Sequence, residues 1–502
     1  MKSNSFFLDQ HGCAKNQVDG ELLVSHLIGS GKWQQTFNAE EADLIIINSC
    51  GFIESAKTES INAVLEARAS YPKAKIILAG CLAQRYGKDL KESLKEADGI
   101  FGNGKLEEIT DAASCVMNGE RYQKEFLQKG VCGGDRKILL SFPGSAYVKI
   151  TEGCNNRCSF CAIPLIRGNL RSRNAQEIIS EIKSLIDKGV YEINLIGQDL
   201  AAYGTGAEDN AFGDGRTFLP SGTPGCLENE GIGAKGESGL ARLLKMISSL
   251  SGTFIVRLLY IHPDHFNPDI LGVMKSDSRF LPYFDIPFQS GDDEIIPKMN
   301  RTGSRKKYSE LIKTIRNVFP EAAIRTTFMA GFPGEKEENF LNTVSFLEEI
   351  KTDWSGCFSY SREDDTPAFD FKPQVSSKIS KKRAEKLVEI QGKITEEKLK
   401  ERAGKEYDIL IEEVLEENHQ SPAEGLAIGR AWFQAPEVDG SVVVRYDRSN
   451  PLENNAVKMG RIVRVFVSGS GEVDLNGDFV CDSPLNKKIK ENQLIFAQSV
   501  NC

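Results

Sequence analysis

The sequence predicts a multidomain α/β protein with an open parallel α/β sheet at its N-terminus, a partial (β/α) barrel in its centre and a small C-terminal β-barrel. Residues 1–120 and 146–402 alternate β-branched apolar runs with segments of helical periodicity, which is typical of parallel sheets covered by helices. After residue 403, short apolar runs are separated by Gly, Asn and Pro, as in small barrels. The turn-rich residues 121–145 are typical of a linker. We therefore expect domains at 1–120, 146–402 and 403–502.

Composition narrows the class of protein. The chain has 502 residues, of which 40% are hydrophobic and 26% charged, which is ordinary for a globular protein. It has neither a signal-peptide pattern at its start nor a run of about 18 apolar residues, so we expect no membrane span. The 12 cysteines then indicate reduced, metal-binding thiols in a cytoplasmic protein. The net charge of −9 disfavours nonspecific binding to nucleic acid.

Three strand–helix units are expected in the N-terminal domain. Their strands are expected at 5–9, 43–48 and 75–79, and their helices at 16–28, 54–69 and 82–97. One cysteine follows each strand within a few residues, namely Cys13, Cys50 and Cys81. Because open α/β sheets bind ligands outside the carboxyl ends of their strands, these three thiols can meet at one point. A single free cysteine is more often a small buried apolar side chain, but three in the same position favour a metal site.

Six further strand–helix units are expected in the central domain. Their strands are expected at 146–150, 191–196, 254–261, 283–287, 323–329 and 354–360, with helices at 175–188, 240–250, 267–274, 304–318 and 336–350. This series fits an open version of the (β/α)8 barrel, whose chemistry lies at the carboxyl ends of the strands. Residues 205–239 interrupt the series with Gly, Asp, Glu and Ser, and we interpret them as a flexible insertion in which Cys226 is not a ligand. Cys132, in the linker, is expected to be structural.

The first central strand is followed by Cys154, Cys158 and Cys161, at the spacing C-x3-C-x2-C. A four-iron cluster held by protein alone needs four thiolates, so three would leave one iron open for another ligand. A closed zinc site would need a fourth protein ligand, and this stretch contains no histidine. Metal-free thiols at this density would be prone to oxidation. The spacing therefore predicts an iron–sulfur cluster with one open iron.

This motif resembles the signature of the radical S-adenosylmethionine (SAM) superfamily. The resemblance implies that SAM binds the open iron and that an electron from the cluster cleaves it to methionine and a 5′-deoxyadenosyl radical. Residues 11–19, 48–54 and 79–85 are similar to the N-terminal domain of the radical SAM methylthiotransferases. That family carries an auxiliary cluster on the cysteines that match Cys13, Cys50 and Cys81. The implied cofactors are two [4Fe–4S] clusters and SAM.

The segments Gly12-Cys13-Ala14-Lys15-Asn16 and Asn48–Ile53 resemble the ribosomal-protein branch of this family. This implies methylthiolation of the β-carbon of an aspartate in small-subunit ribosomal protein twelve, with a basic ribosomal protein and an electron donor as partners. Thr327 departs from that branch, and Gln289-Ser290-Gly291 is similar to the tRNA-modifying branch. Methylthiolation of an adenosine in tRNA is therefore the alternative. An iron–sulfur scaffold or electron carrier is a third reading, but a carrier would be expected to close its clusters with four cysteines.

Polar and Gly-rich segments follow several of the expected central strands. The family resemblance implies SAM contacts in these segments, and we assign them to Gln198, Gln289, Arg325, Gly331 and Glu335. Glycines in these turns would let backbone groups approach SAM closely. For each residue alone, a turn or helix-capping role is the alternative.

The C-terminal region, residues 403–502, resembles the TRAM domain of the same family. It contains 10 basic and 16 acidic side chains, a net charge of −6. Binding to RNA is dominated by phosphate contacts, so an RNA-binding barrel should be basic. The acidic balance favours a basic protein as the partner, although a merely solvated acidic surface would have the same composition. Residues 434–440 are expected to contribute to this docking surface.

Overall fold

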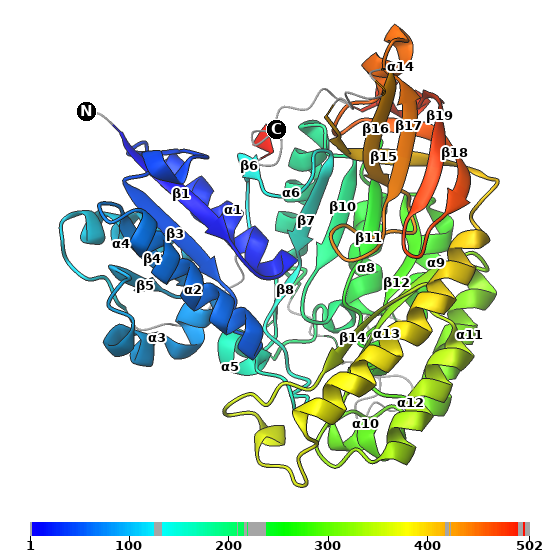
Figure 1. Ribbon diagram of the computed structural model, residues 1–502, viewed down its shortest axis with the longest axis horizontal. Coiled ribbons are helices and arrows are strands. Elements are labelled where there is room, and N and C mark those ends of the chain that lie inside the picture. Colours follow the sequence, from blue (N-terminus) through cyan, green and yellow to red (C-terminus); the bar gives the residue numbers. More distant parts are fainter. Residues whose placement is uncertain are drawn as a thin grey trace.

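Three β-structures follow one another along the chain in the computed structural model, which describes residues 3–124, 133–207, 209–214, 218, 237–416, 421, 423–489 and 495–496. The N-terminal sheet, the central sheet and the C-terminal barrel occupy separate regions, blue, green and orange to red in Figure 1. Cys132 and Cys226, and most of the expected insertion at 205–239, lie outside the described residues.

The N-terminal sheet is parallel throughout, in the strand order β2-β1-β3-β4-β5. Its strands are β1 (Asn4–Gln10), β2 (Trp33–Gln35), β3 (Leu44–Ser49), β4 (Lys75–Gly80) and β5 (Gly99–Phe101). Its helices are α1 (Ala14–Gly29), α2 (Glu54–Ser70), α3 (Cys81–Ser93) and α4 (Ile109–Met117). All six residues of β3 are buried, as expected for an apolar run covered by helices on both faces. The sequence did not predict β2 and β5, because three residues are too few to show a periodic pattern.

Register brings the three N-terminal turns to one edge of this sheet. Gln10 pairs with Asn48, and Asn48 pairs in turn with Ala79, so β1, β3 and β4 end level with one another. The residues that follow these strands must therefore project from the same edge.

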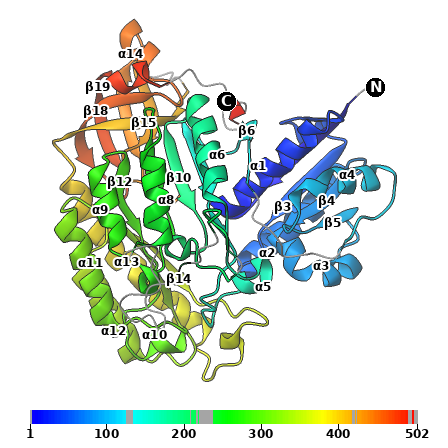
Figure 2. The same cartoon turned by 180° about the vertical axis from the view of Figure 1, so that it is seen from behind.

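The central sheet has six parallel strands in the order β14-β13-β12-β11-β10-β7. The strands are β7 (Ser145–Lys149), β10 (Glu192–Ile196), β11 (Ile255–Leu258), β12 (Phe280–Asp285), β13 (Ala323–Ala330) and β14 (Trp354–Ser359). The helices of these units are α6 (Ala175–Asp187), α8 (Gly239–Ser248), α9 (Asp269–Ser276), α11 (Arg305–Val318) and α12 (Glu337–Ile350). Figure 2 shows α8, α9, α11 and α12 along the outer side of this sheet. The open parallel sheet expected from the sequence is confirmed.

The C-terminal barrel is closed, in the order β15-β16-β17-β19-β18. It consists of β15 (Glu406–Val414), β16 (Glu424–Arg430), β17 (Val442–Asp447), β18 (Ile462–Ser470) and β19 (Leu475–Asp482), with α14 (Pro451–Ala456) between β17 and β18. The long helix α13 (Ser377–Lys400) leads into it. Near the end of the chain, β20 (Ile495–Phe496) pairs with β6 (Ile138–Leu139), beside the N-terminal half of the molecule.

Buried ion pairs join the N-terminal and central domains. Asp19 of α1 pairs with Lys149 of β7 and with Arg167, and all three side chains are at most 2% exposed. Arg136 pairs with Glu21 of α1 and Glu181 of α6, each at 2.5 Å. A buried ion loses its solvation and is tolerated only when its partners are in place. The relative position of these two domains is therefore fixed by charge pairing as well as by apolar contact.

The C-terminal barrel is joined to the central sheet in a similar way. Arg430 of β16 pairs with Glu192 of β10 at 2.7 Å, and Asp439 accepts a hydrogen bond from the Tyr283 hydroxyl at 2.6 Å. Gln434 and Ala435 are fully buried at this junction. Gln434, Ala435 and Asp439 therefore hold the two domains together, whereas Glu437 and Val438 of the expected docking stretch are exposed, and docking there stays a prediction.

Among the described residues, none of the helices is both long and apolar enough to cross a membrane.

Candidate active site

The three N-terminal cysteines lie at the sheet edge defined above. Cys13 precedes α1, Cys50 follows β3 and Cys81 begins α3. The turns that carry them are tightly packed: a Cβ at Gly12 would lie 3.1 Å from the Cβ of Cys50, and one at Gly51 would lie 2.7 Å from the Leu82 Cα. Gly12 also has a φ of +88°, which side chains other than glycine rarely adopt. These glycines let the three cysteine turns approach one another.

The three central cysteines lie in one loop after the short strand β8 (Thr151–Glu152). The Cys161 amide donates to the Cys158 carbonyl at 2.9 Å, and the Cys154 amide donates to the Gly168 carbonyl at 3.1 Å. The loop thus closes on itself and runs directly into α5 (Ile163–Arg167). Three thiols are held within eight residues.

The N-terminal cysteine site contacts the segment that follows the central cysteines. Cys81 packs in one apolar cluster with Ala162 and Ile166, which directly follow the central cysteines. Arg167, the last residue of α5, donates to the Cys81 Sγ at 3.1 Å. Figures 1 and 2 both place α5 against the N-terminal domain. The segment that ends the central cysteine loop therefore also lines the N-terminal cysteine site.

The pKa values of the thiols, which depend on burial and on nearby charges, are compatible with a metal centre. Burial raises the pKa of Cys81 and of Cys161 to about 12 and also raises that of Cys154. Such thiols stay protonated at neutral pH unless a cation is added, and a metal ion deprotonates the thiols that bind it. At Cys13, burial also raises the pKa, but the charges of Lys15 and Arg167 outweigh it and the net pKa is lowered.

The thiols are also in the reduced state that a metal site requires. All nine cysteines in the described part of the chain are free, including both groups of three. Each group offers three sulfur donors, and so each could hold a four-iron cluster with one iron left open.

Two cationic or imidazole side chains approach Cys158. The His262 Nε2 lies 4.0 Å from its Sγ. Arg301 is held by the carbonyl oxygens of Pro287 and Phe288, and the negative charge of Cys158 raises the Arg301 pKa against the opposing effect of burial. Burial lowers the pKa of His262 to about 3, and the neighbouring Arg301 charge adds to this effect. His262 is therefore a neutral imidazole beside the central thiols.

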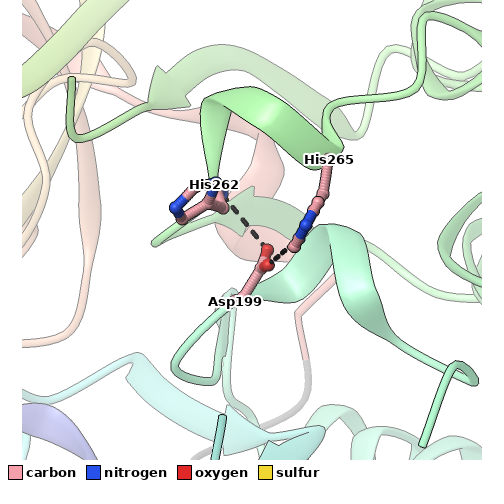
Figure 3. A group of neighbouring side chains, drawn as sticks. All are labelled: Asp199, His262 and His265. Atoms are coloured by element: carbon pink, nitrogen blue, oxygen red, sulfur yellow. Dashed lines mark hydrogen bonds and ion pairs between the residues drawn. The ribbon is translucent and has the colours of Figure 1, made fainter. Parts of the chain in front are cut away.

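Asp199, His262 and His265 form a compact group at the ends of β10 and β11 (Figure 3). The His265 Nδ1 lies 2.6 Å from one Asp199 carboxylate oxygen, and the His262 backbone amide donates to the other at 3.2 Å. Asn156 of the cysteine loop also donates to this carboxylate, at 3.1 Å. Figure 3 shows the His262 ring turned away from Asp199. Because the carboxylate is already occupied by donors, we interpret the group as a brace for the cysteine loop rather than a metal site.

Among the expected SAM contacts, Gln198, which follows β10, is the one that the structure supports most strongly. Its Oε1 is buried without a hydrogen-bond partner among the described residues. The hydroxyl of Thr151, the first residue of β8, likewise has no hydrogen-bond partner among the described residues. A buried polar atom without a partner is costly, and an ammonium group such as that of SAM would satisfy an acceptor here.

The other expected SAM contacts already have partners in the protein. Glu335 accepts from the Gly331 amide at 2.9 Å and from Arg383 of α13 at 2.7 Å. Gly331 has a φ of +79°, and a Cβ there would overlap Ser380 of α13. These contacts match the turn alternative for Gly331 and Glu335.

Gln289 and Arg325 lie on neighbouring strand segments. Gln289 has a φ of +69° and its backbone is hydrogen-bonded to β13 on both sides. Arg325, in the first half of β13, pairs with Asp285 and with Asp439 of the C-terminal domain, each at 3.3 Å. Their contacts with SAM remain predictions.

Sequence reasoning missed the residues that join the two cysteine sites. Arg167 follows the cysteine motif by six positions, but nothing in the sequence pairs it with Cys81. Glu363 binds Lys57 at 3.1 Å and Arg85 at 2.9 Å, linking the loop after β14 to the N-terminal domain. Lys15, inside the quoted N-terminal motif, lies with its Nζ 3.2 Å from the centroid of the Tyr260 ring. Its buried position lowers its pKa.

Three family models match the chain in order. Residues 5–102 match the Uncharacterized protein family UPF0004, residues 148–347 the radical SAM superfamily and residues 403–480 the TRAM domain.

Curated relatives cover almost the whole chain. A protein named ribosomal protein uS12 methylthiotransferase RimO, from Treponema denticola, is 49% identical over 483 residues, which are 93% of this chain and 99% of that protein. A protein of the same name from Aquifex aeolicus is 38% identical over 467 residues, 93% of this chain and 95% of that protein.

The radical SAM methyltransferase TsrM from Kitasatospora setae, solved with cobalamin and a [4Fe–4S] cluster, has a similar fold. Its TM-score is 0.50 at 14% sequence identity, covering 73% of this chain and 77% of that one. At this identity the likeness concerns the fold alone.

Proposed function

The chain belongs to the RimO family of ribosomal protein uS12 methylthiotransferases, and on that premise we propose that it replaces a hydrogen on the β-carbon of an aspartate in uS12 by a methylthio group. It is a radical SAM enzyme that uses SAM and two [4Fe–4S] clusters. We place the reaction in the cytoplasm, where the ribosomal protein is made, and an electron donor is required. The proposed domain limits are 1–120, 146–402 and 403–502, with residues 121–145 as a linker.

In this proposal each group of three cysteines holds one cluster. Cys154, Cys158 and Cys161 hold the cluster at the central strand ends, where Gln198 accepts from the amino group of SAM. Cys13, Cys50 and Cys81 hold the cluster at the edge of the N-terminal sheet. When bound, the clusters supply the electron for SAM cleavage and the sulfur for transfer. The protein's own residues, Arg167 among them, hold the two sites next to one another.

One observation supports this function most strongly: Cys81 packs against the residues that directly follow Cys161, and Arg167 spans from one cysteine loop to the other. A reaction that cleaves SAM at one site and transfers sulfur from another needs the two sites to be adjacent, because a reactive species must not escape. A scaffold or an electron carrier needs no second substrate site between the clusters.

The acidic C-terminal barrel supports a basic protein partner. Its net charge of −6 would attract a basic ribosomal protein and repel the phosphates of RNA. The curated relatives quoted above carry the name of a uS12-modifying enzyme. The tRNA alternative is therefore not favoured.

Mass spectrometry tests this function. The anaerobically reconstituted protein, with SAM and a reductant, should add one methylthio group to an aspartate of uS12, supplied free or on the small ribosomal subunit. A parallel reaction with tRNA, hydrolysed and analysed in the same way, should show no methylthioadenosine. Modified tRNA with unmodified uS12 would refute the proposal.

A further inference from the structure

Three lysines are buried in the described part of the chain, and one of them differs from the other two. Lys57 and Lys149 each bind two carboxylates. Lys15 is 9% exposed, and its ammonium makes no hydrogen bond or ion pair with any described residue. Its Nζ lies over the face of the Tyr260 ring, 3.2 Å from the ring centroid.

Lys15 lies where the two cysteine sites face one another. It is in the first turn of α1, two residues after Cys13. Tyr260 belongs to the segment that follows β11, at the carboxyl end of the central sheet, and has a φ of +69°. A non-glycine residue in this conformation is strained, and such strain is found most often where a ring or a ligand must be positioned. The ammonium thus lies between the N-terminal thiols and the central strand ends.

A buried ammonium that pairs directly with no carboxylate is costly, because it has lost its water without gaining a hydrogen-bonded anion in exchange. A ring face compensates only part of this loss and covers one side of the ammonium. The two anions of the protein that act most on Lys15 have other partners: the Cys13 thiolate is an expected cluster ligand, and Asp285 accepts from the Tyr260 amide at 3.2 Å and pairs with Arg325. The remaining donors of Lys15 are therefore available to an anion that is not part of the chain.

We propose that Lys15 binds the side-chain carboxylate of the uS12 aspartate that is modified, with the Tyr260 ring covering the opposite side of the ammonium. This inference rests on the proposed function and assigns the substrate contact within it. The carboxylate is one bond away from the β-carbon, so fixing it sets which hydrogen faces the central site and which face of the carbon faces the N-terminal site. Lys15 is then a residue that selects aspartate over asparagine, because a neutral amide cannot replace the charge.

Two other anions could occupy the same position. One is the carboxylate of SAM, and the other is a sulfur ligand at the N-terminal cluster. Binding of SAM by Lys15 would show in the SAM concentration needed for cleavage, and binding of a sulfur ligand would show in the cluster spectrum.

The test is a double-mutant cycle between Lys15 and the substrate. The holoenzyme with both clusters is prepared as wild type, Lys15→Met, Lys15→Arg and, as a matched control, Lys91→Met, which removes an exposed lysine of the same domain. Binding of uS12 is measured anaerobically by titration, once with the acceptor aspartate and once with that aspartate changed to asparagine. The cycle isolates the coupling between the two side chains from any general effect of either change.

We expect the wild type and Lys91→Met to prefer aspartate over asparagine by roughly tenfold or more, as for a charge-assisted hydrogen bond. Lys15→Met should lower affinity for the aspartate protein to that for the asparagine protein, and Lys15→Arg should retain part of the preference. Iron content and the visible absorption of each variant are measured in the same samples.

Several results would overturn the inference. Equal affinity of the wild type for the two uS12 proteins would do so without reference to any variant, and so would an unchanged preference in Lys15→Met. A rise in the SAM concentration needed for half-maximal cleavage in Lys15→Met would assign the ammonium to SAM instead. Loss of iron or an altered cluster spectrum in Lys15→Met, together with a wild type that binds the two uS12 proteins equally, would assign the ammonium to the cluster. If the wild type modifies no uS12 at all, the proposed function fails, and not only this inference.

Discussion

The two cysteine sites are built in opposite ways. The central three come from eight consecutive residues, and their loop is closed by its own backbone hydrogen bonds. The N-terminal three come from turns after β1, β3 and β4, and only the register of the sheet brings those turns level. The first site is therefore specified by local sequence, whereas the second exists only when the whole N-terminal sheet has folded.

Their surroundings differ as well. The central thiols lie beside a neutral imidazole, His262, and one buried cation, Arg301. The N-terminal thiols lie beside Lys15 and Arg167, and their charges lower the pKa of Cys13 against the effect of burial. A more positive environment favours bound anions. The central site therefore suits the binding of SAM. The more positive N-terminal site suits the binding of anionic sulfur next to an acidic substrate.

Loss of the central site should have the largest effect. Changing Cys154, Cys158 and Cys161 to Ala should abolish SAM cleavage and lower the iron content from about eight to about four per chain. The measurement is 5′-deoxyadenosine formation by chromatography, with iron analysis of the same sample. Cleavage at the wild-type rate would contradict the assignment of the central loop.

Loss of the N-terminal site should separate the two half-reactions. Changing Cys13, Cys50 and Cys81 to Ala should stop methylthio transfer, while 5′-deoxyadenosine continues to form at the central site. Iron should again fall to about four per chain. If the central cluster disappears together with the N-terminal one, the two sites are not independent.

The pairing between the sites should matter for stability. Arg167→Met leaves the buried carboxylates of Asp19 and Glu152 without one of their cations, and breaking a buried pair costs about 3–5 kcal/mol. The expected result is a clear decrease in the urea midpoint of the anaerobic protein. Arg445→Met is the control, since its ion pair with Asp478 is about half exposed and should contribute less than about 1 kcal/mol. Equal midpoints for the two variants would show that the junction does not depend on Arg167.

The smallest expected effect concerns SAM. Gln198→Leu removes the buried acceptor that has no partner among the described residues, and a hydrogen bond to a charged group accounts for roughly tenfold to a hundredfold in affinity. The SAM concentration for half-maximal cleavage should rise by that factor with the iron content unchanged. Gln176→Leu, on the exposed side of α6, should leave it unaltered. An unaltered value for Gln198→Leu would remove Gln198 from the SAM site.

The sequence predicted most elements of the three domains because their apolar runs are long and regular. It also predicted both groups of cysteines as candidate ligands, one from spacing and one from the position of each cysteine after a strand. It could not predict contacts whose partners are far apart in the chain, such as Arg167 with Cys81 or Glu363 with Arg85. No local pattern distinguishes a buried arginine of this kind from one on the surface.

Residues 434–440 also have contacts that the sequence could not predict. Their composition suggested an exposed docking surface, but Gln434 is buried and Asp439 is bound to Tyr283 and Arg325 of the central domain. An acidic side chain can bind a partner protein or a neighbouring domain of its own chain, and the sequence alone does not distinguish the two. Of this stretch, Glu437 and Val438 are exposed, and a basic partner could contact the stretch only there.

Electron paramagnetic resonance of the reduced protein tests most directly whether the two cysteine groups form one active site. The spectrum of the wild type is compared with the sum of spectra from the two triple-alanine variants, each of which retains one cluster. Since Cys81 packs directly against the end of the central cysteine loop, we expect the two clusters to interact magnetically, so that the wild-type spectrum is broadened or split relative to the sum. A wild-type spectrum equal to the sum would contradict the face-to-face arrangement and the reaction built on it.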